Sequence, residues 1–163
     1  MNATLFTGYI LDATFIIDIG RRYRPPESRH AARRVVEELI GRGLIVSPRE
    51  VYLELKAKTK GAGDETLTWC DSHKDIFKEL TDAQQGCLAD VLKRFPTLLK
   101  QDAEGPDADP ILVAMALDLG WTVVSRDGAG AGSNVVRVHQ VCAELNIPCL
   151  TDHQFLKQNG WTG

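Results

Sequence analysis

Short apolar segments alternate with longer amphipathic segments, and this alternation most constrains what the chain can fold into. Strands made of continuous apolar residues are typical of parallel sheets that are covered on both faces. Amphipathic helices between them would supply those covers, so the pattern predicts an α/β domain, a three-layer α/β/α arrangement with a mostly parallel central sheet. The expected strands are residues 9–11, 44–46, 121–125 and 148–150.

The expected helices lie between these strands. Apolar side chains recur at helical spacing in residues 30–40, and Gly41 follows as a stop. Ser47–Glu50 has the pattern of a capping box, with Pro48 at the first helical position. The other predicted elements are helices at residues 14–20, 65–72, 82–95 and 140–145, one opened by Asp109-Pro110, a short one near Phe155, and a strand fragment at 135–138.

The composition fits one globular domain spanning residues 1–163, with 44% hydrophobic and 25% charged residues. Nineteen basic residues against 22 acidic ones give a net charge of −3. This balance excludes nucleic-acid binding by bulk positive charge, but not by a local basic patch. The chain has no apolar run long enough to span a bilayer, and its first residues lack the basic region of a secretory signal. We therefore expect a cytoplasmic protein that does not contact a membrane.

The four cysteines contain no Cys-x-x-Cys pair, and the four histidines have no His-Glu-x-x-His spacing. Without a secretion signal, we expect buried or free thiols rather than disulfides. A zinc site is not expected.

Four acids are placed where strands end or helices begin. Asp12 follows the first predicted strand, and Asp127 follows the third. Asp109 opens the helix that leads into the third strand, and Glu54 lies in the helix after the second. Since the carboxyl ends of parallel strands meet at one edge of a sheet, these carboxylates are expected to converge there.

Such a cluster of carboxylates repels itself, so some of the pKa values rise unless a cation sits among the acids. Carboxylate oxygens suit Mg²⁺ or Mn²⁺, which keep several waters and also bind phosphate. The chemistry that fits this site is hydrolysis of a phosphodiester bond.

Each acid also has a structural interpretation. Asp109 before Pro110 suits a helix N-cap, and Asp12 suits a cap for the helix that follows it. Asp127-Gly128 is a common turn pair, and Glu54 with Lys58 has the spacing of a surface ion pair. Only the joint placement of the four acids favours a common site.

Four segments in this order resemble the PIN-domain ribonuclease superfamily. They are LDATFIID at residues 11–18, IVSPREVYLEL at 45–55, ADPILVA at 108–114 and VVSRD at 123–127. The resemblance runs from about residue 9 to residue 160, and includes the Val-Cys-x-Glu-Leu motif of a PIN-like microbial subfamily at 141–145. It implies an endoribonuclease that depends on Mg²⁺ or Mn²⁺ and leaves a 5′-phosphate. It also implies a VapC-like toxin that pairs with an antitoxin and forms a homodimer.

The resemblance also assigns roles to individual residues. It makes Asp12, Glu54, Asp109 and Asp127 the catalytic acids, and places the metal on Asp12, Asp109 and Asp127. It makes Thr14 and Ser125 the hydroxyls that orient a carboxylate or a metal-bound water. Ala13 departs from the pattern, because many relatives have Thr at this position. Asp107 is an additional acid to which no role is assigned.

Arginines follow the Asp12 segment closely and could hold RNA phosphates beside the acids. The predicted RNA-binding residues are Arg21, Arg22 and Arg24, and Tyr23 is placed to stack on a base. The alternative is a solvated helix face, on which Arg33 with Glu37 or Arg34 with Glu38 would form an ion pair.

Two further function classes remain as alternatives. The first is a catalytically silent PIN-like module that binds RNA or a protein partner. The second is a nucleotide-binding enzyme that uses the glycine run at residues 128–133, although this run lacks the lysine of a phosphate-binding loop. A dehalogenase-type phosphatase is disfavoured, because Asp12-Ala13-Thr14 lacks the second acid of that chemistry.

Overall fold

A five-stranded, all-parallel sheet organises the chain, as the alternating pattern predicts. The computed structural model describes residues 7–19, 26–58, 65–96, 108–126 and 138–162. The strand order is β3-β2-β1-β4-β5, and every neighbouring pair is parallel. The strands are β1 (Tyr9–Leu11), β2 (Ile45–Pro48), β3 (Phe77–Lys78), β4 (Thr122–Val124) and β5 (Cys149–Leu150).

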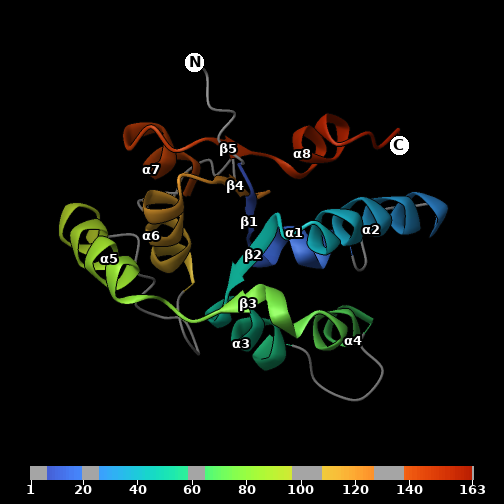
Figure 1. Cartoon of the computed structure of the whole chain (residues 1–163), viewed down its shortest axis with the longest axis horizontal. Coiled ribbons are helices and arrows are strands. Elements are labelled where there is room, and N and C mark those ends of the chain that lie inside the picture. The colour runs from blue at the N-terminus through green and yellow to red at the C-terminus, as the bar shows by residue number, and fades with distance from the viewer. Residues whose placement is uncertain (1–6, 20–25, 59–64, 97–107, 127–137, 163) are drawn as a thin grey trace.

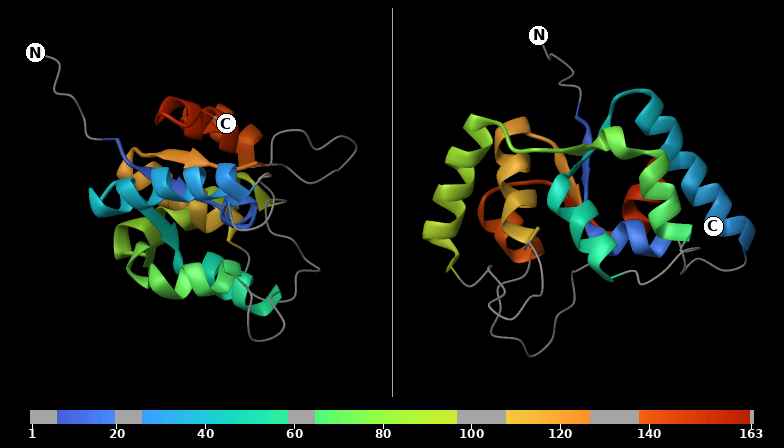
Figure 2. Two further views of the ribbon diagram at one scale, coloured as in Figure 1. Left: turned by 90° about the vertical axis from the view of Figure 1, so that its right-hand side faces the viewer. Right: turned by 90° about the horizontal axis from the view of Figure 1, so that it is seen from below.

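Helices cover both faces of this sheet, which confirms the three-layer α/β/α class (Figure 1). Helices α5 and α6 lie on one side of the strands, and α1 and α2 lie on the other, as the two further views also show (Figure 2). The helices are α1 (Ala13–Ile17), α2 (Pro26–Gly41), α3 (Arg49–Lys58), α4 (Glu65–Ser72), the 3₁₀ turn η2 (Lys74–Ile76), α5 (Asp82–Arg94), α6 (Asp109–Leu119), α7 (Val138–Glu144) and α8 (Asp152–Gln158).

The strand order reverses direction at β1, the central strand. From β1 the chain builds outward to β2 and β3, and then adds β4 and β5 on the other side. The last paired residues of β1 and β4 are Leu11 and Val124. The residues after them, Asp12 and Ser125, therefore lie at the carboxyl edge beside the reversal point, where open α/β sheets form their ligand crevice.

The core explains why the strands carry almost no polar residues. Ile10, Val123 and Val124 are fully buried between the two helical layers. Helix α8 joins the layer of α1, because its Phe155 ring packs edge-on against Phe15 with ring centroids 5.2 Å apart. No described helix is long and apolar enough to cross a membrane.

The predicted capping box at Ser47–Glu50 is wrong. Ser47 and Pro48 belong to β2, and α3 begins only at Arg49. The Ser47 hydroxyl instead donates a 2.7 Å hydrogen bond to the Leu11 carbonyl oxygen, and both groups are buried. Because this bond ties the end of β2 to the end of β1, Ser47 helps to assemble the edge on which Asp12 lies.

Several predicted boundaries also differ from the structure. Helix α2 begins at Pro26, four residues earlier than predicted, because a proline is well placed in the first turn of a helix. The two-residue edge strand β3 was not predicted, since it is too short to carry a pattern. Of the strand fragment predicted at 135–138, only Val138 is described, and it begins α7. All four cysteines are free, as expected.

The Gly8→Ala variant is expected to be less stable, because a Cβ on Gly8 would overlap the indole ring of Trp121. Overpacking of this kind costs about 1–3 kcal/mol in free energy of unfolding, which chemical denaturation measures. Gly86→Ala is the matched control: its Cβ would meet nothing within 4 Å, so this variant should gain up to about 1 kcal/mol. Equal stability of Gly8→Ala and wild type would contradict the close packing of Gly8 against Trp121, the residues that directly precede β1 and β4.

Candidate functional site

Asp12 is buried at the carboxyl edge of the sheet, and three hydrogen bonds fix its carboxylate. One oxygen accepts from the backbone N–H of Ala13 at 2.7 Å, which caps helix α1. The other accepts from the Ser125 hydroxyl at 2.7 Å and from the Thr14 hydroxyl at 3.1 Å. The structure therefore brings Asp12, Thr14 and Ser125 together, although Asp12 and Ser125 are 113 residues apart in the sequence.

Burial raises the pKa of Asp12, because it removes the charged carboxylate from water. The hydrogen bonds from Ser125, Ala13 and Thr14 act in the opposite direction, and the negative charge of Glu54 raises this pKa further. Asp12 and Glu54 thus lie close enough to repel each other. A divalent cation fits this pair, since it would offset both the burial and the repulsion.

Two of the other predicted acids are described, and both lie toward the same edge. Glu54 is half-buried in α3, which starts directly after β2. Helix α6 ends two residues before β4 begins, so its first residue, Asp109, lies at the opposite end of the helix, toward the carboxyl edge. Asp109 is not the N-cap, as one interpretation of the sequence expected: Ala108 holds that position, with no capping side chain.

The rest of the predicted site lies outside the described residues. This applies to Asp127, the arginines Arg21, Arg22 and Arg24, the residue Asp107 and the glycine run at 128–133. Within the described ranges, no three Asp, Glu, His or Cys side chains form a group that could hold a metal ion. The metal ligands therefore remain a prediction.

A second acid, Asp18, was not assigned a role from the sequence and lies at the other end of α1. It is the C-cap of that helix, and its side chain is 1% exposed. Its carboxylate lies 3.3 Å from the guanidinium of Arg126, the residue after Ser125. The only sequence signal for Asp18 is an acid within the apolar run TFIIDIG at residues 14–20.

His139 supports the same edge from α7. Its Nε2 donates to the carbonyl oxygen of Ser125 at 2.8 Å. Together with the bond from the backbone N–H of Ser125 to the Leu150 carbonyl, this holds the residue that donates to Asp12. The sequence offered no signal for this contact, because no histidine spacing pointed to it.

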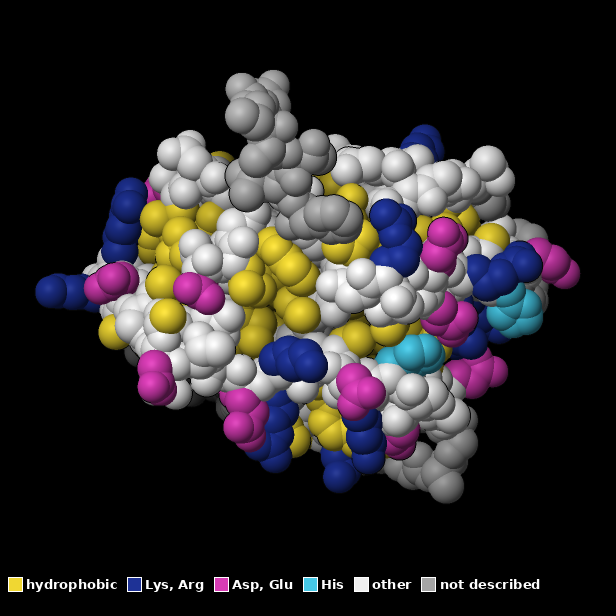
Figure 3. Space-filling model, in the orientation of Figure 1, with side chains coloured by type: hydrophobic (Ala, Val, Ile, Leu, Met, Phe, Trp, Pro, Cys, Tyr) yellow, Lys and Arg dark blue, Asp and Glu magenta, His cyan; other side chains and the backbone are white. Residues whose placement is uncertain are grey.

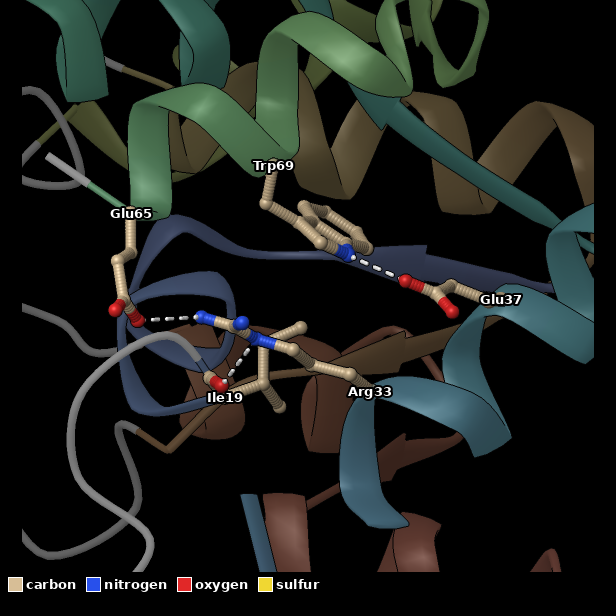
Figure 4. Close-up of polar contacts among 5 residues, drawn as sticks. All are labelled: Ile19, Arg33, Glu37, Glu65 and Trp69. Carbon is tan, nitrogen blue, oxygen red and sulfur yellow. Dashed lines mark hydrogen bonds and ion pairs between the residues drawn. The ribbon is translucent and has the colours of Figure 1, made fainter. Parts of the chain in front are cut away.

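Helices α2 and α4 border an open groove of about 430 Å³. The Arg33 side chain lies in it, donating to the Ile19 carbonyl at 3.1 Å and to Glu65 at 3.4 Å (Figure 4). The Glu37 carboxylate accepts from the indole N–H of Trp69 at 3.2 Å. The predicted helical pair of Arg33 with Glu37 is therefore wrong: both side chains bridge to α4 instead of to each other.

The described fold is PIN-like, a three-layer α/β/α arrangement of the class that the sequence resemblance implies. It is similar to the solved structure described as "Crystal Structure of FitAcB from Neisseria gonorrhoeae", with a TM-score of 0.53. The two share 13% identity over 89% of this chain and 98% of the other, so the likeness concerns the fold alone.

The chain belongs to the family described as "Domain of unknown function (DUF4411)", whose model matches residues 9–163. No curated protein sequence matches it.

The Asp12→Asn variant is expected to melt at a higher temperature than wild type at neutral pH without divalent metal. Because the pKa of Asp12 is raised in the folded state, the ionised carboxylate destabilises the fold. This destabilisation is absent at a pH below the ordinary pKa of 3.8, and it is complete at a pH above the raised pKa. Asparagine lacks this charge and keeps an acceptor for the Ala13 N–H, and its amide NH2 can donate to the Ser125 and Thr14 hydroxyls, which then act as acceptors.

Calorimetric melting from pH 4 to pH 8 measures this difference, which should grow as the pH rises. Asp75→Asn, at an exposed position, is the control and should melt like wild type across this range. A lower melting temperature for Asp12→Asn at neutral pH would contradict the assigned burial and repulsion.

Proposed function

We propose that this chain is a metal-dependent endoribonuclease that hydrolyses RNA phosphodiester bonds with Mg²⁺ or Mn²⁺. The observation that carries the proposal is the placement of Asp12: a buried, hydrogen-bonded carboxylate at the reversal point of the sheet, repelled by Glu54. A structural cap needs neither a second acid nor a hydroxyl from Ser125, the residue that follows the distant strand β4. Burying such a group without a compensating charge is unfavourable, and this favours a cation-binding role.

Each of these residues has a proposed role. Asp12, Asp109 and Asp127 would hold the ion, and Glu54 would orient the water that attacks the phosphorus. The hydroxyls of Ser125 and Thr14 fix the Asp12 oxygens, so that the carboxylate does not have to reorganise when substrate binds. When bound, the ion lowers the pKa of water and neutralises charge on the leaving oxygen.

RNA must be held locally, because the chain as a whole carries a net charge of −3. On the face drawn in Figure 3, basic and acidic side chains are interspersed rather than separated into one basic field. Arg21, Arg22 and Arg24 follow α1 in the chain, and we assign them to phosphate contacts beside the acids. This arrangement gives modest affinity that falls with added salt.

As biological context, we propose that the chain is the toxin of a toxin–antitoxin pair and acts as a homodimer in the cytoplasm. The PIN-like fold supports this assignment, together with the four-segment resemblance to VapC-like toxins.

The alternative function is a catalytically silent module that binds RNA or a protein partner. The groove between α2 and α4 favours the protein partner, because its described lining carries two carboxylates, Glu37 and Glu65, and one arginine, Arg33. A partner segment with a lysine or arginine would complement these charges. Under this alternative, RNA or the partner binds without metal and no RNA is cut.

The test is cleavage of single-stranded RNA with and without Mg²⁺ or Mn²⁺. Asp12→Asn and Asp109→Asn should each lose at least about 100-fold in rate, because each removes a negative ligand. Ser125→Ala should lose about 10–100-fold, since Asp12 would keep its charge but lose an orienting bond. Asp75→Asn is the matched control, because Asp75 is exposed and lies before β3, away from the carboxyl ends of the strands. Cleavage by all variants at the wild-type rate, or none by wild type with either ion, would remove the proposal.

A further inference from the structure

The Asp18 carboxylate lies at the end of helix α1 that suits its charge least. The last turn of a helix exposes carbonyl oxygens with negative partial charge, and Asp18 is the C-cap of α1. It is also 1% exposed, so water does not compensate the charge. A carboxylate in this position needs a cation, and Arg126 lies 3.3 Å away.

Arg126 is held at two points on the same helix. Its guanidinium contacts Asp18 at the C-terminal end of α1, and its backbone N–H donates to the Thr14 hydroxyl at 3.2 Å near the N-terminal end. The preceding residue, Ser125, donates to Asp12. Two consecutive residues after β4 therefore contact the two acids that flank α1, and this fixes the arginine relative to Asp12.

The guanidinium is nevertheless open to solvent on one side. The Arg126 side chain is 42% exposed, although its partner is almost completely buried. A guanidinium has five N–H donors, and the contact with one Asp18 oxygen at 3.3 Å does not use all of them. Arg126 is close to Asp12 in the fold, because its backbone N–H and the Asp12 carboxylate share one partner, the Thr14 hydroxyl. The chain therefore presents a cation beside the buried acid.

We propose that Arg126 binds a phosphate of the RNA substrate adjacent to the phosphate that is cleaved at Asp12. This inference rests on the proposed endoribonuclease function and names a substrate contact for the same site. Arginine suits the contact, because its planar fork matches phosphate oxygens. A cation here also offsets the repulsion between RNA and the acidic edge. Asp18 acts through Arg126 and is a positioning residue.

The first experiment measures the salt dependence of single-stranded RNA binding in EDTA, where no cleavage occurs. The double variant Asp18→Asn/Arg126→Met removes both charges and leaves no buried acid without its cation. Loss of one phosphate contact should reduce the slope of log K against log[salt] by about 0.7. Arg42→Met is the matched control: Arg42 directly precedes the segment that enters β2, at the opposite edge of the sheet, and its slope should match wild type.

The second experiment uses Asp18→Asn alone, which retains the Arg126 charge but releases its orientation. KM for RNA cleavage should rise several-fold while kcat changes little, and the melting temperature serves as the check on folding. A purely structural role would lower kcat together with the melting temperature.

The outcomes separate this inference from the function on which it rests. Wild-type RNA binding with an unchanged slope in the double variant would overturn the Arg126 contact and leave the nuclease proposal intact. An unchanged KM in Asp18→Asn would overturn the positioning role of Asp18. This test does not depend on whether the double variant folds. Failure of the wild type itself to bind or cut RNA would instead overturn the proposed function.

Discussion

The pairing of β1 with β4 is the constraint on which the rest of the structure depends. These two strands meet where the strand order reverses, and their ends place Asp12 and Ser125 side by side. The 2.7 Å hydrogen bond between them joins residues 113 positions apart. Helix α1 then starts from Asp12 itself, so the same carboxylate caps a helix and lies at the crevice. The structural interpretation of Asp12 as a cap is therefore confirmed, and its role as a metal ligand stays a prediction.

Several negative charges near this edge destabilise the fold. Burial and Glu54 both raise the pKa of Asp12, and Asp18 lies buried at the C-terminal end of α1. In the second case the chain supplies its own cation, Arg126. In the first, the described residues supply hydrogen bonds from Ser125 and Thr14. Active sites commonly retain such unfavourable charges, because the substrate or an ion compensates them during function.

The α/β class and the central strands could be predicted from the sequence, because continuous apolar runs such as residues 9–11 fit only a sheet that is covered on both faces. Local capping signals were less reliable. Ser47 has the sequence pattern of a cap, but the neighbouring strand offers it a buried carbonyl at Leu11, and tertiary contact prevails. Asp18 and Arg126 were not assigned because their pairing depends on the distance between α1 and the end of β4. That distance exists only in the folded chain, and the same holds for the bridge from Arg33 to Glu65.

The central claim is that acids distant in sequence converge at this edge to hold a divalent ion. An anomalous-difference map from a crystal soaked in Mn²⁺ tests it most directly. We expect one strong peak at about 2.0–2.2 Å from a carboxylate oxygen of Asp12, with Asp109 or Asp127 as a further ligand. A map with no peak at this edge, or with manganese bound only elsewhere on the molecule, would contradict it.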